Sequence, residues 1–247
     1  MLWIRWNLVP SDRKRTEIFL ALVALAEPAE ILAQLVANGI SSLCPLKYDL
    51  YIYHFDKIFG SPSFAVGQLV FRHEWLLILV SIVYGLLPIA VLITLGSYLW
   101  LVGVEEMVRA LKAFVLNLFA ALPVYLCIPV CGPQFAFRDF PRAPQMVAPH
   151  PMDLSAAPNG IPSVHFSTSL LVLWFLSRWK CGRIVGFAFA ALMVIATLGS
   201  GQHYCLDLLC AIPYVAGVLW VTGLKESKAV AVKSFSAGTS LGEPSGC

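Results

Sequence analysis

The sequence predicts an all-α, polytopic membrane protein, a bundle of six transmembrane helices. Of the 247 residues, 59% are hydrophobic and only 13% are charged, and the mean hydropathy of +0.78 is too high for a soluble domain. Apolar stretches near the length that crosses a bilayer recur along the chain. The predicted spans are 17–38, 75–101, 111–130, 164–178, 184–201 and 204–223.

Two of the six spans are weaker than the others. The first carries Glu27 and Glu30 around Pro28, and 164–178 is short unless it takes residues from the loop before it. At the junction of the last two spans, glycines end one helix and His203 opens the next. A six-helix bundle remains the simplest account of the pattern.

The basic residues support the same count, because lysine and arginine concentrate in cytoplasmic loops. With a cytoplasmic N-terminus, 12 of the 17 lie in inside segments and five lie outside. The outside residues are Lys47, Lys57, Arg72, Arg138 and Arg142. Both termini are therefore expected in the cytoplasm. The basic residues are spread over several loops, so the net charge of +3 does not indicate a nucleic-acid partner.

The spans divide the chain into three parts. Residues 1–16 are expected to form a basic cytoplasmic leader, 17–223 the six-helix membrane domain, and 224–247 a disordered cytoplasmic tail. Two outer segments, 39–74 and 131–163, are long. In the first, aromatic and polar residues alternate over 48–56, which suits the headgroup layer and predicts solvated side chains there, Asp56 included.

The second outer segment is rich in proline and holds Arg138 and Arg142. Many fixed φ angles predict a stiff, non-helical cover. A guanidinium group matches the geometry of a phosphate, so the two arginines are candidates for binding a substrate phosphate or, equally, anionic lipid headgroups.

Seven scattered cysteines contain no CxxC pair and are interpreted as packing residues. Cys44 and Cys131 both lie on the predicted outer side, and the sequence leaves open whether they form a disulfide.

Ionisable residues at the start of two apolar stretches are the strongest functional signal, because such groups are costly at a membrane edge. Ser163 and His165 stand where one span begins. His203 opens another, and Asp207 lies four residues on, so that its side chain shares a helix face with His203. The unpaired N–H groups of a helix start, near Ser163, also attract anions. The pattern predicts one site that contains all four residues.

A histidine held by a carboxylate is fixed in one tautomer and becomes a better nucleophile, which Asp207 can do for His203. A second histidine, His165, is placed to act as a general acid.

These residues resemble the motifs of the type 2 phosphatidic acid phosphatase (PAP2) superfamily, whose members share a six-helix membrane bundle. The segment 162–165, Pro-Ser-Val-His, is similar to the PSGH motif, and His203 with Asp207 is similar to the HxxxD end of the SRxxxxxHxxxD motif. The resemblance implies that His203 forms a phosphohistidine, Asp207 orients it, and His165 protonates the leaving alcohol. It implies no metal and no cofactor.

The sequence departs from the superfamily motifs at two places, and these departures point to one branch of the superfamily. The arginine of the SRxxxxxHxxxD motif, six residues before the histidine, is replaced by Thr197. The KxxxxxxRP motif with which the superfamily pattern opens has no clear match in this sequence. With His203 followed by Tyr204, and with the stretches 122–133 and 140–141, the chain resembles the branch of inositol phosphorylceramide synthase. The matching segments cover about 110–215.

The predicted function is phosphoryl transfer from a phospholipid or lipid phosphate, with an acceptor alcohol as in an inositol phosphotransferase. A simple phosphohydrolase, acting on phosphatidate or a polyprenyl phosphate, fits the same motifs. A metal site made of His165, His203 and Asp207 is a further possibility. A small transporter that uses Glu27, Glu30 and the histidines is another.

The charge pattern suits a bacterial plasma membrane with the site facing the periplasm, and equally a luminal site in an endomembrane. The lipid, the acceptor and the oligomeric state stay open.

Overall fold

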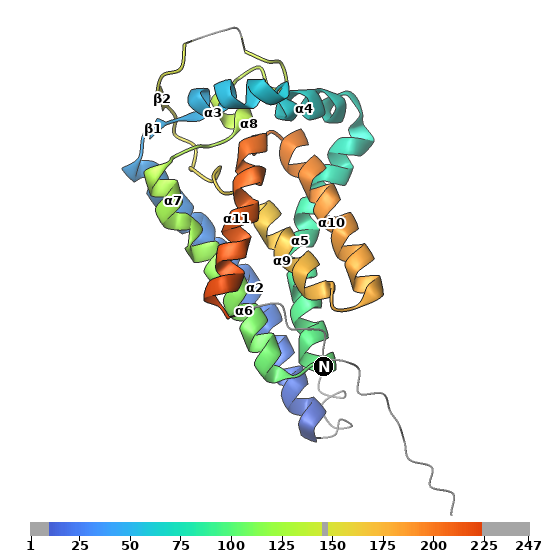
Figure 1. Cartoon of the computed structure of the whole chain (residues 1–247). Helices are drawn as coiled ribbons and strands as arrows, with labels where there is room; N and C mark the ends of the chain where they lie inside the picture. Colours follow the sequence, from blue (N-terminus) through green and yellow to red (C-terminus); the bar gives the residue numbers. More distant parts are fainter. Residues whose placement is uncertain (1–9, 145–147, 224–247) are drawn as a thin grey trace, which may run out of the picture.

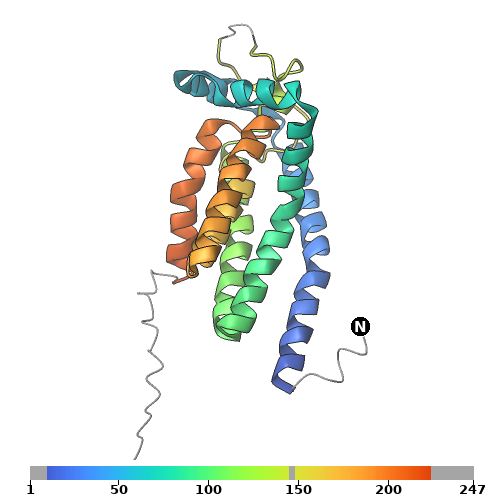
Figure 2. The ribbon, with the colours of Figure 1, turned by 90° about the vertical axis from the view of Figure 1, so that its right-hand side faces the viewer.

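The computed structural model of the chain describes residues 10–144 and 148–223. Long helices run side by side along one axis, and shorter segments cross one end of them (Figures 1 and 2). The long helices are α2 (Pro10–Leu43), α5 (Glu74–Leu101), α6 (Val104–Phe119) continued by α7 (Ala121–Cys127), α9 (Val164–Leu176), α10 (Lys180–Gly199) and α11 (Cys205–Val221).

Helices cover most of each predicted span, with 111–130 divided between α6 and α7, and the apolar helices fit a membrane protein. By length and composition, three helical stretches in the described ranges can cross a bilayer: Glu74–Leu101, Val104–Cys127 and Lys180–Gly199. Helices α9 and α11 are apolar but shorter, with 13 and 17 residues. At about 1.5 Å per residue they are about 20 and 26 Å long, against a hydrocarbon core of about 30 Å. The six-span count therefore stays a prediction.

Helix boundaries differ from the prediction where polar residues continue a helix. Helix α6 starts at Val104, seven residues before the predicted span, because Glu105 and Glu106 suit a helix N-terminus and Glu106 pairs with Arg109 at 2.7 Å. Helix α2 likewise begins at Pro10, inside the expected leader. The tail 224–247 and the side chains of Glu27 and Glu30 lie outside the described residues.

The segments at the end of the bundle form a cap, made of α3 (Asp49–Asp56), the 3-10 helix η1 (Lys57–Phe59), α4 (Pro62–Arg72) and α8 (Pro133–Ala136). Figure 1 shows α3 and α4 lying across the upper ends of α10 and α11. A two-stranded antiparallel pairing joins β1 (Leu46–Lys47) to β2 (Met152–Asp153), with Leu46 opposite Asp153. Apart from α8 and β2, the described part of the proline-rich outer segment is irregular, as predicted.

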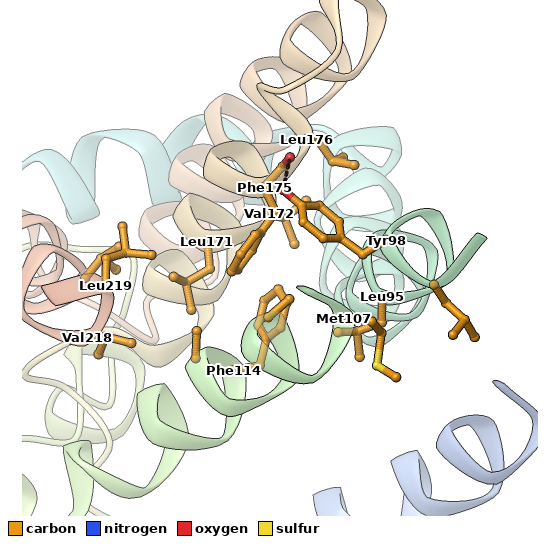
Figure 3. Close-up of a cluster of buried hydrophobic side chains, with 14 residues drawn as sticks. Leu95, Tyr98, Met107, Phe114, Leu171, Val172, Phe175, Leu176, Val218 and Leu219 are labelled. Atoms are coloured by element: carbon orange, nitrogen blue, oxygen red, sulfur yellow. Dashed lines mark hydrogen bonds between the residues drawn. The ribbon is translucent and has the colours of Figure 1, made fainter. Parts of the chain in front are cut away.

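Within the described residues, four apolar clusters of buried side chains hold these parts together, one of them in the lower part of the bundle and another beneath the cap. The largest cluster lies among α5, α6, α9 and α11, away from the cap, and includes Leu99, Phe114, Leu171 and Phe175. Within it the hydroxyl of Tyr98 donates to the backbone carbonyl of Phe175 at 3.1 Å (Figure 3). This cluster fixes the lower part of the bundle.

The second cluster lies beneath the cap and joins it to the bundle. Tyr53 of α3 packs against Phe64 of α4 and Phe137, with ring centroids 5.3 and 5.2 Å away. Tyr204, at the start of α11, belongs to the same cluster and is fully buried. Aromatic pairs of this kind contribute about 0.5–1.5 kcal/mol each beyond the area that they bury. The cap is therefore packed onto the start of α11.

Candidate active site

The turn that carries His203 connects α10 to α11 and is held by backbone contacts. The N–H of His203 donates to the carbonyl of Thr197 at 3.3 Å, and the N–H of Gln134 donates to the carbonyl of Gly201 at 2.8 Å. Gly132 packs so closely that a Cβ there would lie 2.1 Å from the carbonyl oxygen of Gln202, and its φ is +103°. Only glycine fits this contact, which sets the segment 132–134 directly against the turn.

His203 and Asp207 are fully buried and form a hydrogen-bonded pair. Nδ1 of His203 lies 3.3 Å from Oδ2 of Asp207. The same Oδ2 accepts the backbone N–H of Tyr204 at 2.9 Å, at the first turn of α11. One oxygen of Asp207 thus fixes both the start of the helix and the direction of the His203 ring.

The other ring nitrogen of His203 is free. Nε2 is buried and, within the described ranges, has no hydrogen-bond partner; the same holds for Oδ1 of Asp207. Buried polar atoms without a partner are rare and each calls for an explanation. Burial lowers the pKa of His203 to about 3, against a smaller opposing effect of the Gly160 backbone, so the imidazole is neutral at neutral pH. A neutral ring with Nδ1–H on a carboxylate presents a lone pair at Nε2, as a nucleophile requires.

His165 lies beside this pair, in the first turn of α9. The centroid of its half-buried ring is 5.8 Å from that of His203, and Tyr84 of α5 packs edge-on against it with centroids 4.8 Å apart. The hydroxyl group of Tyr84 lies 3.4 Å from Oγ of Ser200, at the start of the His203 turn. Residues from α5, α9 and the α10–α11 turn therefore meet at one place.

Ser163 joins the starts of α9 and α11. It is the N-cap of α9, and its Oγ accepts the N–H of Phe166 at 3.3 Å. Its own N–H donates to the carbonyl of Asp207 at 3.3 Å. The preceding Pro162 carbonyl accepts the hydroxyl of Tyr125 at 3.0 Å. The structure thus brings Ser163, His165, His203 and Asp207 together.

Arg138 and Arg142 are not part of this group. Both side chains are exposed in the segment after α8. Among the described residues, neither guanidinium group makes a hydrogen bond or ion pair with His165, His203 or Asp207.

The side chain of Thr197, which stands at the position of the motif arginine, does not reach the site. Thr197 is fully buried in the last turn of α10, and its Oγ1 donates within its own helix, 2.8 Å from the carbonyl of Met193. Threonine is uncharged and its hydroxyl group is used within the helix, so Thr197 cannot neutralise a substrate phosphate.

Sequence reasoning missed two carboxylates in the cap. Asp56 was expected to be solvated, but it is fully buried, as is Asp49. Burial raises the pKa of each to about 6. The two lie seven residues apart, or two helical turns, and this spacing, which puts both on one face of α3, was the signal available in the sequence.

The sequence leaves two possibilities open, a metal site at the histidines and a disulfide between Cys44 and Cys131. In residues 10–144 and 148–223, no group of three or more His, Cys, Asp or Glu side chains is arranged to hold a metal ion. Cys44 and Cys131 are free thiols, and their sulfurs face different carbonyls, those of Leu126 and Ala156.

Comparison with known proteins gives a family. A family model described as "PAP2 superfamily" matches residues 51–221, well over half of the chain. Neither the curated proteins nor the solved structures gave a match. The chain therefore belongs to the PAP2 superfamily, and this membership supports a phosphatase-type activity on a lipid phosphate in a membrane.

Proposed function

We propose that this member of the PAP2 superfamily transfers the phosphoryl group of a phospholipid or lipid phosphate through a phosphohistidine on His203. The observation that carries the proposal is the state of the His203 ring. Its Nδ1 faces Asp207, while Nε2 is buried without a partner in the described ranges, next to His165. A nucleophile, its orienting carboxylate and a second titratable ring are the groups that a two-step displacement needs.

In the first step, Nε2 of His203 attacks the phosphorus in line. The N–P bond forms as the bond from phosphorus to the lipid oxygen breaks, and protonated His165 gives its proton to that oxygen. The positive charge that develops on the His203 ring is stabilised by Asp207 at 3.3 Å.

In the second step, water or an alcohol attacks the phosphohistidine. His165 now takes the proton from the attacking oxygen, the N–P bond breaks, and His203 returns to its neutral form. Both steps depend mainly on positioning and on neutralising charge, as in other phosphoryl transfers.

A phosphodiester substrate fits the charges of this site better than a phosphomonoester does. The position of the motif arginine is filled by buried Thr197, and the carboxylate of Asp207 lies directly behind His203. A diester brings one negative charge where a monoester brings up to two, and charge is costly to bury without a partner. We therefore favour transfer from a phospholipid, as in the inositol phosphorylceramide synthase-like branch, with a simple phosphohydrolase as the alternative.

We propose that the substrate phosphate binds near Ser163, at the N-terminus of α9, with Arg138 and Arg142 reaching it from the outer segment. Because both arginines are exposed, we expect Arg138→Gln or Arg142→Gln to raise KM about threefold to tenfold and to leave kcat unchanged. Arg72→Gln, which changes an exposed arginine at the end of α4, is the matched control. Equal effects of all three would show only a change in surface charge.

The function is tested by incubating purified protein with labelled phosphatidylinositol, phosphatidate and a polyprenyl phosphate, with and without ceramide or diacylglycerol. A new phosphorylated lipid without a water-soluble phosphate product indicates a transferase. Free phosphate from a monoester, or inositol phosphate from phosphatidylinositol, indicates a hydrolase. His203→Ala should abolish both products while the protein stays folded. No product from folded wild-type protein across the panel would contradict the proposal.

The membrane topology remains part of the proposal. Twelve of the 17 basic residues lie in the predicted inside segments, which supports cytoplasmic termini and an active site on the outer face, in a bacterial plasma membrane or on a luminal side.

A further inference from the structure

The cap contributes two buried carboxylates that bind no side-chain cation in the described structure. Asp49 and Asp56 are both 0% exposed, at the two ends of α3. Burying a carboxylate is costly unless hydrogen bonds satisfy it. The hydrogen bonds of both lead to the turn that carries His203 or to the segment packed against it. This arrangement suggests a role for α3 in shaping the turn.

Asp56 binds the backbone just after His203. Its Oδ1 accepts the N–H of Cys205, the first residue of α11, at 2.9 Å. The contact joins residues 149 apart in the chain. A free N–H at a helix start is normally capped by the residue just before the helix, so α11 takes part of its N-terminal cap from another element.

Ser63 binds His203 itself. Its Oγ lies 3.0 Å from the carbonyl oxygen of His203 and 3.5 Å from Oδ2 of Asp56. A hydroxyl group has one proton, and the shorter distance directs it to the His203 carbonyl. Ser63 and Asp56 together hold the peptide groups from His203 to Cys205.

Asp49 binds the other side of the same turn. It accepts the hydroxyl of Tyr204 at 3.1 Å, the N–H of Gly132 at 2.8 Å and the N–H of Cys131 at 3.0 Å. Gly132 is the residue in close contact with the carbonyl of Gln202. Asp49 therefore fixes Tyr204 and the segment on which the His203 turn rests.

We propose that Asp56 and Ser63 are positioning residues, which hold the backbone around His203 so that its free ring nitrogen faces the substrate. Asp49 supports them through Tyr204 and Gly132. The inference rests on the proposed function of His203, but it adds residues that lie outside the motifs. None of the three touches the ring of His203; each acts through the backbone or through Tyr204.

The alternative is that Asp56 acts through its charge, and the substitution Asp56→Asn separates the two roles. Asparagine keeps an oxygen for the N–H of Cys205, and its NH₂ group can donate to Oγ of Ser63, so the geometry is preserved and the charge is removed. Asp56→Ala removes both. A positioning role predicts that asparagine substitutes and alanine does not.

The test measures kcat and KM for wild type, Asp56→Asn, Asp56→Ala, Ser63→Ala and Ser169→Ala. A small shift of the nucleophile costs about 10- to 100-fold in rate, so we expect this loss in kcat for Asp56→Ala and Ser63→Ala, with KM within about twofold. Ser169 is the matched control, a buried serine whose Oγ donates to the Phe166 carbonyl at 2.7 Å within α9. Asp56→Asn and Ser169→Ala should stay close to wild type.

A second measurement does not depend on turnover. The chain has five histidines, so ¹⁵N labelling of histidine gives few imidazole signals, and His203→Ala identifies those of His203. We expect Asp56→Ala and Ser63→Ala to move the signals of the His203 ring, and Asp56→Asn and Ser169→Ala to leave them in place. If wild type shows no turnover, the proposed function fails, and these signals still decide the positioning role.

Two results would overturn the inference. In the first, Asp56→Ala and Ser63→Ala keep both the wild-type kcat and the wild-type ring signals. In the second, Asp56→Asn loses as much kcat as Asp56→Ala while the ring signals do not move, which would assign the effect to charge. If Asp56→Ala does not fold, Ser63→Ala carries the same test, because it removes a single hydroxyl group.

Discussion

The substitution Asp207→Asn removes the charge behind the nucleophile and keeps its geometry. Oδ2 of Asp207 accepts both from Nδ1 of His203 and from the N–H of Tyr204. Because the Tyr204 N–H needs an acceptor at this point, the asparagine oxygen takes the Oδ2 position. Its NH₂ group then takes the place of Oδ1, which has no partner in the described structure. His203 keeps its orientation and its tautomer.

The expected loss follows from the distance between the two groups. At 3.3 Å, an imidazolium and a carboxylate attract each other by about 5 kcal/mol at an effective dielectric constant of about 20. This is the most that the substitution can remove from the transition state. The difference between a charged and a neutral hydrogen bond, about 1 kcal/mol, is the least. A central value of about 2.7 kcal/mol gives a decrease in kcat of about 100-fold.

The assay is steady-state turnover of the active lipid by wild type, Asp207→Asn and Asp207→Ala, each with its thermal unfolding curve. Asp207→Asn should unfold near the wild-type temperature. Asp207→Ala leaves the Tyr204 N–H unpaired, so it should lose about 1–3 kcal/mol of stability and more kcat than asparagine does. A kcat for Asp207→Asn within about twofold of wild type, or below that of Asp207→Ala, would refute the reasoning.

Three further predictions concern the surroundings of the site. Gly132→Ala should lower the unfolding temperature and reduce kcat at least about tenfold, because its Cβ would lie 2.1 Å from the Gln202 carbonyl oxygen and would displace the His203 turn. The control is Gly103→Ala, where φ is +141° and, in the described structure, no atom beyond the adjacent residues lies within 4 Å of the added Cβ. It should cost about 1–3 kcal/mol of backbone strain and leave kcat unchanged. Thr197→Arg, which restores the motif arginine, should lower stability and activity, because the site is closed; higher activity in a lipid phosphatase assay would contradict this. The pKa of Asp49 and of Asp56 rises from 3.8 to about 6 on folding, so the native state binds more protons in this window and the free energy of unfolding should fall as the pH rises from about 4 to about 6. Each contributes at most about 3 kcal/mol, and Asp56→Asn should flatten the profile; a rise in stability over this window would contradict the prediction.

The positions of the long helices and the proximity of His165 to His203 were predictable, because their signals in the sequence are local. Each apolar segment bounded by charged residues is mostly helical in the structure. Helix α6 begins before its apolar segment because its first turn is polar, with Glu105 and Glu106. His165 and His203 each stand where an apolar helix begins, and helices of an antiparallel bundle place such ends at one face. The structure brings the two rings to 5.8 Å, as this pattern suggests.

The cap could not be predicted, because its partners are backbone groups far away in the sequence. Asp56 binds the N–H of Cys205 and Asp49 binds those of Cys131 and Gly132. Every residue except proline carries the same N–H group, so no residue type marks these contacts. The alternation of aromatic and polar residues in 48–56 suggested an interfacial segment. Instead, the ring of Tyr53 points into the buried cluster that joins the cap to the bundle, and Asp49 and Asp56 are buried too.

The substrate could be predicted only in part, because the groups that would bind its phosphate are not marked clearly in the sequence. The loss of the motif arginine at Thr197 was visible, and the structure adds that the position is buried and closed. Arg138 and Arg142, the candidate replacements, lie on the surface, where a sequence pattern does not tell a substrate contact from a lipid contact.

The most direct test of the account is to trap the phosphoryl-enzyme. Protein is mixed briefly with a phospholipid labelled at phosphorus, quenched in base and digested, and the labelled peptide is sequenced by mass spectrometry. We predict an acid-labile, base-stable phosphoryl group on His203 that is absent in His203→Ala, accumulates in wild type when the acceptor is withheld, and forms more slowly in His165→Ala. A turnover-competent protein in which the label is never found on His203, or in which His203→Ala keeps the wild-type rate, would contradict the account.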